Sequence, residues 1–318
     1  MPLLDLPENP CPSGAVTEMI RCADGVAIRT ARWPALTRHP AGTICLFHGR
    51  SEFIEKYFEV IRDLRARGFA VATFDWRGQG GSDRLIENGR LGHVEDFSHY
   101  ARDVDAFMRH VALPECPSPF QALAHSMGSA ILFASLAGRS AWFERLVATA
   151  PMIEVWDAPP FARLAARTLG SLGLSHHVVP GWSTAPVALQ QPFAGNPVTS
   201  DARRYAVAAA LANADPRLAI GGPTIGWVRA AFDVMDMLRS PRFGAQWRLP
   251  CLVVLAGDDR VVSTPAAEAF AAKLRATACI SLPGALHEVM QERDDLRSRF
   301  FAAFDAFVPG QPGLALAR

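Results

Sequence analysis

A serine lies in the segment Ala122-Leu-Ala-His-Ser126-Met-Gly128, between a short apolar run and a longer one of helix length. Small residues lie two positions before it and two after it, at Ala124 and Gly128. A strand-to-helix turn that exposes a serine hydroxyl needs such neighbours, because larger side chains would clash with the nearby backbone. The segment therefore predicts a nucleophile at Ser126. The alternative is an ordinary serine that caps the N-terminus of a helix.

A serine hydroxyl becomes a good nucleophile when an imidazole takes its proton and a carboxylate orients that imidazole. Two apolar runs nearer the C-terminus end in Asp258-Asp259 and in a loop that contains His287. The order serine, acid, histidine is the one that nucleophile-elbow enzymes use. The sequence thus predicts a triad of Ser126, Asp259 and His287. Asp258 is the alternative acid, and otherwise it is expected to cap backbone N–H groups.

Attack by serine creates an oxyanion, which needs two preorganised N–H donors. In this arrangement one donor is the residue after the nucleophile, and the other lies in the loop after the third strand. These positions are the backbone amides of Met127 and Arg50. The Arg50 side chain is expected either to pair with Glu52 or Glu55 or to face an anionic group in the site.

Strand-length apolar runs alternate with amphipathic stretches of helix length, a pattern typical of a mostly parallel sheet flanked by helices. The expected elements are a hairpin over 16–33, strands over 43–47, 70–74, 120–124, 146–150, 251–256 and 279–282, and helices between them. Between 151 and 247 this rhythm stops, and the chain is rich in proline and aromatic residues. We expect an α/β core over 1–150 and 248–318, with a helical cap (lid) inserted over 151–247.

Charge and composition narrow the function. The 318 residues carry 32 Lys plus Arg against 31 Asp plus Glu, a formal net charge of +1. This balance provides no field for capturing nucleic acid, so no nucleic-acid partner is expected. The first residues show neither the basic nor the apolar region of a signal sequence, and no run of about 18 apolar residues occurs. We expect a cytoplasmic protein that at most contacts membrane lipid peripherally.

Motifs for metals and cofactors are incomplete. The six cysteines are scattered, without a Cys-x-x-Cys pair. The stretch from His287 to Gln291 begins like a zinc-protease helix but lacks the second histidine, and Gly78-x-Gly80-x-x-Asp83 lacks the third small residue of a dinucleotide fingerprint. We therefore predict no metal and no cofactor.

With these motifs in place, the chain resembles α/β-hydrolases of the monoacylglycerol lipase and lysophospholipase group, most of all bacterial lysophospholipases of the PldB type. The resemblance begins near Thr43 and rests on Gly49-Arg-Ser-Glu-Phe-Ile-Glu-Lys-Tyr57, Asp75-Trp-Arg-Gly-Gln-Gly80, Gly92-His-Val94, Ala124-His-Ser-Met-Gly128, Asp215-Pro216 and Gly221-Gly-Pro-Thr224 with Trp227. It implies an α/β-hydrolase fold, with the nucleophile at Ser126, the acid at Asp259 and the base at His287. His48 departs from the PldB pattern toward other lipases.

The resemblance implies a serine ester hydrolase that releases a fatty acid from a small lipid ester, with a lysophospholipid as the expected substrate. Monoacylglycerol lipase and general carboxylesterase activities are the alternatives that His48 leaves open. Aromatic residues of the cap suit an apolar chain, and Trp182, Trp227 and Phe161 are the candidate substrate-binding residues.

Two more remote alternatives use the same fold. A peptidase of the proline iminopeptidase kind would need an acidic anchor for a substrate amino group, for which Glu154, Asp157 and Asp201 are candidates. A non-catalytic ligand receptor would need no complete triad and oxyanion hole.

Overall fold

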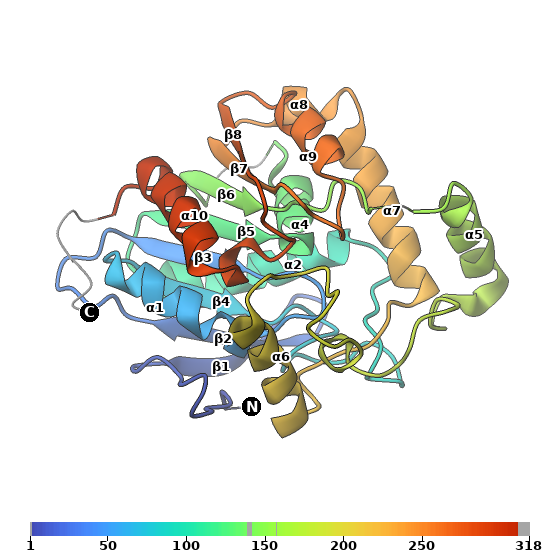
Figure 1. Cartoon of the computed structure of the whole chain (residues 1–318), viewed down its shortest axis with the longest axis horizontal. Coiled ribbons are helices and arrows are strands. Elements are labelled where there is room, and N and C mark those ends of the chain that lie inside the picture. Colours follow the sequence, from blue (N-terminus) through green and yellow to red (C-terminus); the bar gives the residue numbers. More distant parts are fainter. Residues whose placement is uncertain (1, 139–141, 157, 311–318) are drawn as a thin grey trace.

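The computed structural model describes residues 2–138, 142–156 and 158–310. Within these residues eight strands form one sheet in the order β1-β2-β4-β3-β5-β6-β7-β8 (Figure 1). The strands are β1 Val16–Arg21, β2 Ala27–Trp33, β3 Thr43–Phe47, β4 Ala70–Phe74, β5 Phe120–His125, β6 Arg145–Thr149, β7 Cys251–Ala256 and β8 Thr277–Leu282. The hairpin β1–β2 and the pair β2–β4 are antiparallel, and all other pairs are parallel. The predicted α/β class and strand positions are confirmed.

Helices cover both faces of this sheet. The helices are α1 Phe58–Ala66, α2 Ser98–Phe107, α3 Leu113–Glu115, α4 Met127–Leu136, α5 Ala162–Leu169, α6 Ala202–Ala214, α7 Ile225–Arg239, α8 Phe243–Gln246, α9 Thr264–Ala271 and α10 Asp294–Phe307. Shorter turns are η1 Ile54–Tyr57, η2 Met108–Ala112, η3 Gly170–Leu174, η4 Val187–Leu189 and η5 Val289–Gln291.

The two helical layers explain why the central strands read as unbroken apolar runs. Phe69, just before β4, packs on Phe304 of α10, while Phe133 of α4 packs on Phe270 of α9 on the other side. Every residue of β3, β5 and β7 is buried. A parallel strand covered on both faces has no solvent side, so it needs no alternation with polar residues.

The segment between β6 and β7 leaves the sheet and returns to it, because β6 and β7 are direct parallel neighbours. Helices α5, α6, α7 and α8 belong to this segment, and Figure 1 shows α5 and α6 lying well apart from each other. The long helix α7 packs against α4, and Phe232 and Met235 join the same apolar core as the sheet. One helix of the expected cap is therefore anchored in the core. Among the described helices, none has the length and apolar character needed to span a bilayer.

Candidate active site

Ser126 lies at the turn between β5 and α4. Its backbone has φ 51° and ψ −115°, so it adopts a positive φ that non-glycine residues rarely take. The turn places α4 directly against the end of β3, because a Cβ on Gly128 would lie 2.6 Å from the carbonyl oxygen of Phe47. The small residue at Gly128 is thus required by this contact. This is the geometry of a nucleophile elbow.

Three side chains meet at this turn, each from the carboxyl end of a different strand. His287 Nε2 lies 2.9 Å from Ser126 Oγ, and His287 Nδ1 lies 2.8 Å from Asp259 Oδ2. Asp259 follows β7, and His287 follows β8. The structure therefore brings together the three residues that the sequence grouped, in the hydrogen-bonding order of a serine hydrolase triad.

The neighbouring carboxylates differ in their surroundings. Asp259 is buried, and its Oδ1 accepts hydrogen bonds from the N–H groups of Val261 and Val262 at 2.7 and 2.9 Å. Asp258 is exposed. The expectation that Asp258 caps backbone N–H groups is therefore wrong, since Asp259 does so while it also holds His287.

The charge of Asp259 is stabilised by its contacts. Burial opposes ionisation, but His287 and the two backbone N–H groups outweigh it, so the pKa of Asp259 lies below its usual value. Ser126, Asp259 and His287 are only 7%, 5% and 5% exposed. An ionised acid in a site from which water is largely excluded is suited to stabilising a protonated imidazole.

The loop after β3 lies beside the nucleophile. A Cβ on Gly49 would lie 3.3 Å from the Cβ of Ser126. The N–H of Met127 is in the first turn of α4, where N–H groups have no partner within the helix. The proximity of this loop to Ser126 agrees with Arg50 and Met127 as the two predicted oxyanion donors.

A buried carboxylate holds this loop in place. Glu52 accepts hydrogen bonds from Gly49 N–H at 2.5 Å, Tyr57 OH at 2.8 Å and Lys56 Nζ at 2.8 Å. Burial opposes the charge of Glu52, but the positive charge of Lys56 outweighs it and keeps the pKa below its usual value. Lys56 also pairs with Glu288, next to His287, at 2.6 Å. One ammonium group thus links the loop after β3, which carries Gly49 and Arg50, to the loop that carries His287.

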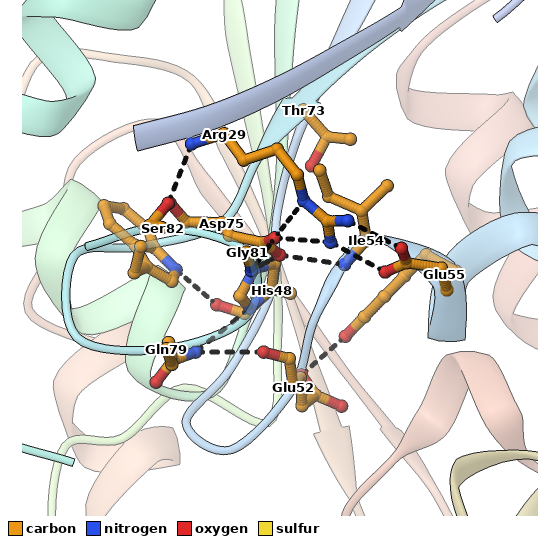
Figure 2. Close-up of polar contacts among 12 residues, drawn as sticks. Arg29, His48, Glu52, Ile54, Glu55, Thr73, Asp75, Gln79, Gly81 and Ser82 are labelled. Atoms are coloured by element: carbon orange, nitrogen blue, oxygen red, sulfur yellow. Dashed lines mark hydrogen bonds and ion pairs between the residues drawn. The ribbon is translucent and has the colours of Figure 1, made fainter. Parts of the chain in front are cut away.

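A second buried network, drawn in Figure 2, supports the same loop. Arg29 is fully buried between Glu55 at 2.7 Å and Asp75 at 2.6 Å. Asp75 also accepts a hydrogen bond from the N–H of Ile54 at 3.0 Å. Gln79 donates to the carbonyl of Gly49 at 2.8 Å. Because each charge is paired or hydrogen-bonded, the network can remain buried and fix the backbone around Gly49.

The sequence alone suggested Glu52 and Glu55 only as possible partners of Arg50, and it assigned no supporting role to any of these residues. A signal was nevertheless present, because the charged residues Glu52, Glu55 and Lys56 interrupt an aromatic stretch that includes Phe53 and Tyr57. Charged residues in such a stretch are buried only when they are paired. The alternative that Arg50 pairs with Glu52 or Glu55 is wrong, since those carboxylates pair with Lys56 and Arg29.

The three aromatic residues proposed for substrate binding are not gathered in one place. Trp227 is buried and packs on Phe97, with its Nε1–H donating to Tyr100 OH at 3.1 Å. Phe161 is 69% exposed and Trp182 is 50% exposed. Within the described residues, neither Phe161 nor Trp182 stacks on another ring. Trp227 alone of the three is part of the packed wall between the core and the inserted segment.

One cluster has the donor types of a metal site. Ligand atoms of His93, Glu95 and His176 lie within 4.8 Å of one another where the 92–95 loop meets the inserted segment. Glu95 is already paired with Arg229 at 2.9 Å, and this cation opposes the binding of a metal ion. The cluster is also distinct from the triad residues. The absence of a metal stays a prediction.

The fold and the Ser126 turn define the class of α/β-hydrolases. The chain belongs to the α/β-hydrolase family that includes lysophospholipases and monoacylglycerol lipases, and the matching family model, described as "Serine aminopeptidase, S33", covers residues 38–294. The predicted resemblance is confirmed.

Relatives in this family share most of their length with the chain. Lysophospholipase L2 of Escherichia coli (strain K12) is 30% identical over 284 residues, which cover 86% of this chain and 82% of that protein. Monoacylglycerol lipase of Mycolicibacterium smegmatis is 27% identical over 257 residues, which cover 80% of this chain and 83% of that protein.

Solved structures show the same fold at lower identity. A soluble variant of monoglyceride lipase from Saccharomyces cerevisiae has a TM-score of 0.71 at 19% identity, covering 92% of this chain and 96% of its own. A thermostable carboxyl esterase from Bacillus coagulans has a TM-score of 0.73 at 18% identity, covering 93% and 100%. At this identity the likeness establishes the architecture.

Proposed function

We propose that the protein is a serine hydrolase of lipid carboxylic esters, with lysophospholipids as its main substrates. The observation that carries the proposal is the chain of hydrogen bonds from Asp259 through His287 to Ser126 Oγ. It is the arrangement that activates a serine for acyl transfer. The curated relatives named lysophospholipase and monoacylglycerol lipase support a lipid ester as the substrate.

In the proposed mechanism, Ser126 Oγ attacks the acyl carbonyl carbon while His287 Nε2 takes the hydroxyl proton. The oxyanion accepts hydrogen bonds from the N–H groups of Arg50 and Met127. Collapse of this intermediate breaks the ester bond, and His287 gives its proton to the leaving alcohol. Water, deprotonated by His287, then attacks the acyl-enzyme, releases the fatty acid and restores Ser126. Asp259 keeps His287 in the correct tautomer and stabilises its protonated form.

Monoacylglycerol is the second candidate substrate, supported by the relative of that name. The two substrates share the acyl ester and differ in the group attached to glycerol. The same triad therefore serves both, and the headgroup contacts decide between them.

A peptidase is disfavoured by the partners of the acidic residues in the inserted segment. Glu154 pairs with Arg163 and Arg239, and Asp201 caps α6 and pairs with Arg204. Neither carboxylate is free to anchor a substrate amino group. Asp157, the third candidate, lies outside the described residues. A non-catalytic receptor would have no need of a hydrogen-bonded triad, so this alternative is also disfavoured.

Contact with a lipid surface is part of the proposal. Most of the exposed large apolar side chains lie in the inserted segment, namely Trp156, Phe161, Leu164, Leu172, Trp182, Leu189, Phe193 and Met237. Side chains of this kind can enter the boundary between headgroups and acyl chains. We propose that they bring the protein to its substrate at a membrane or micelle surface, from the cytoplasmic side.

The test is fatty-acid release from a lysophospholipid and a monoacylglycerol with the same acyl chain, by the unmodified protein and by Ser126→Ala. We expect release that depends on Ser126 and is faster from the lysophospholipid. Faster release from the monoacylglycerol would keep the mechanism and change the substrate. Release that persists in Ser126→Ala, or no release at all, would contradict the proposed function.

A further inference from the structure

The Arg50 guanidinium is a cation with neutral partners only. Nη1 donates to Ser51 Oγ at 2.9 Å, and Nη2 donates to the carbonyl of Gly221 at 2.8 Å. The buried Nε has no hydrogen-bond partner. No carboxylate within the described residues lies within ion-pair distance of this guanidinium. A charge whose Nε is buried without a partner and which has no counter-ion is unfavourable, so the position is suited to receiving an anion.

The surroundings form a socket for the guanidinium. Its carbon lies 5.0 Å from the ring centroid of Trp227, which is held by Tyr100. A Cβ on Gly92 would lie 2.9 Å from Nη2, so this glycine lets the guanidinium pack closely against the backbone. Burial lowers the pKa of Arg50 to about 10, which leaves the group positively charged at neutral pH. The socket orients the group, and Arg50 as a whole residue is only partly buried.

Arg84 shows what a structural arginine of similar burial looks like in the same chain. All three of its guanidinium nitrogens donate to backbone carbonyls, those of Gly89, Ser82 and Arg217. Its hydrogen-bonding capacity is therefore used within the protein. The unused donor of Arg50 has no such internal explanation, and the two residues form a matched pair for an experiment.

The position of Arg50 in the site points to the anion. Its backbone follows Gly49, which lies against Ser126, so the reacting ester lies near the Arg50 main chain. The side chain then leads from that point toward Gly221 and Trp227. In a 1-acyl lysophospholipid the phosphate is separated from the acyl carbonyl by a linker about as long as an arginine side chain. A guanidinium donates to two phosphate oxygens at once, and its planar fork fits them.

We propose that the Arg50 side chain binds the phosphodiester of a lysophospholipid headgroup and so determines preference over neutral monoacylglycerols. The inference rests on the proposed function and specifies its substrate class. One residue then serves both ends of the substrate, with its backbone N–H at the acyl carbonyl and its guanidinium at the phosphate.

The kinetic test compares 1-oleoyl-lysophosphatidylethanolamine with 1-oleoylglycerol. We expect Arg50→Gln to reduce kcat/KM at least about ten-fold more on the lysophospholipid than on the monoacylglycerol, because a charge-assisted contact is lost with one substrate only. Arg50→Lys keeps the charge but not the planar fork, so its preference for the lysophospholipid is expected to lie between those of the unmodified protein and Arg50→Gln. Arg84→Gln should leave the ratio of the two kcat/KM values within about two-fold. Equal losses on both substrates in Arg50→Gln would overturn the inference.

A binding test separates this inference from the proposed function. The probes are the non-hydrolysable 1-O-octadecyl lysophosphatidylethanolamine and 1-O-octadecylglycerol, titrated calorimetrically into the folded protein. We expect tighter binding of the phosphate-bearing ether, and loss of that difference in Arg50→Gln but not in Arg84→Gln. Equal binding of both ethers overturns the inference about Arg50, even if hydrolysis depends on Ser126 and the proposed function holds. If no substrate is hydrolysed but the preference for the phosphate-bearing ether still depends on Arg50, the proposed function is contradicted and this inference is not. Binding of sn-glycerol 3-phosphate as tight as that of the ether lysophospholipid would instead indicate a site for small phosphate esters and overturn the lipid assignment.

Discussion

The carboxylate of Glu52 accepts a hydrogen bond from the backbone N–H of Gly49 at 2.5 Å, while Lys56 joins that carboxylate to Glu288 beside His287. The two sides of the site are therefore held by one buried ion-pair chain. Charges of this kind stay buried because each has a partner, and removal of one leaves another uncompensated.

Glu52→Gln tests whether this ion-pair chain positions the loop after β3 and the proposed oxyanion donor on it. The amide keeps the size of the side chain but removes the charge that pairs with Lys56. We expect kcat to fall by about 10- to 100-fold with little change in KM, because an oxyanion donor is displaced while substrate contacts remain. Steady-state kinetics on a short-chain ester would measure the separate changes in kcat and KM. Glu59→Gln, which removes a carboxylate of α1 that pairs with Arg204, is the control, and equal effects of the two variants would argue against a positioning role.

The triad predicts unequal effects for two adjacent aspartates. Asp259→Asn removes the acceptor that holds His287, and we expect kcat to fall at least about 10³-fold. Ser126→Ala and His287→Ala should each lose about 10³-fold or more as well. Asp258→Asn should retain activity within about two-fold, because its side chain is exposed. Circular dichroism would establish that all four variants fold, and similar losses for the two aspartate variants would contradict the assignment of Asp259.

The elbow and the triad were predictable because each depends on a short stretch of sequence. A strand followed by small residues around a serine marks Ser126, and strand ends mark the loops of Asp259 and His287. The choice between Asp258 and Asp259 needed the structure to show which carboxylate turns inward. For two adjacent residues in a loop, the path of the backbone decides which side chain points inward, and the sequence does not show that path.

The supporting networks were not predictable in the same way, because their members are far apart in the chain. Lys56 and Glu288 are 232 residues apart, and Arg29 and Asp75 are 46 apart. Burial of a charge becomes visible only when its partner is known. Likewise, aromatic type alone did not show that Trp227 faces inward while Phe161 faces solvent, since that depends on how each helix of the inserted segment packs.

Gly128→Ala should impair catalysis through the main chain. The new Cβ would lie 2.6 Å from the carbonyl oxygen of Phe47 and 2.7 Å from that of His48, so β3 and the loop after it must shift. We expect a loss of about 1–3 kcal/mol in the free energy of unfolding and a loss of activity at least about ten-fold. Gly25→Ala is the control, because it costs about 1–2 kcal/mol through its positive φ in the β1–β2 turn and leaves the site untouched. Full activity in folded Gly128→Ala would contradict the expected shift of the loop.

Exposed apolar residues in and just before α5, and in η3, should contribute to lipid binding. Phe161, Leu164 and Leu172 are 69%, 70% and 69% exposed. Their combined replacement by serine is expected to weaken co-sedimentation with phosphatidylglycerol-containing vesicles at least about ten-fold, because apolar area no longer enters the bilayer boundary. The control is the double variant Leu36→Ser and Leu113→Ser, which replaces two exposed leucines outside the inserted segment. Unchanged vesicle binding by the triple variant would exclude this surface as the contact.

The stability of the protein should depend on pH through His125, which precedes the nucleophile. Burial lowers the pKa of this imidazole to about 3, and its Nδ1 lies 3.1 Å from Thr149 Oγ1. An unfolded histidine titrates near pH 6.5, so between these values the unfolded state binds a proton that the folded state does not. The free energy of unfolding must therefore fall as pH drops below about 6.5, by up to about 1.4 kcal/mol per pH unit from this group.

His125→Asn would isolate this contribution, because the amide can keep the contact with Thr149 but does not titrate. Urea unfolding between about pH 4.5 and pH 7 should show a shallower pH slope in the variant, by close to one bound proton, whatever its stability at pH 7. The exposed His110 provides the control, since His110→Asn removes an imidazole whose surroundings change little on unfolding. An identical slope in His125→Asn and the unmodified protein would mean that His125 is already protonated in the folded state. A neutral, buried His125 also places no second positive charge beside His287, whose ring lies 4.8 Å away. In the proposed mechanism, the imidazolium of His287 therefore faces Asp259 without competition from its neighbour.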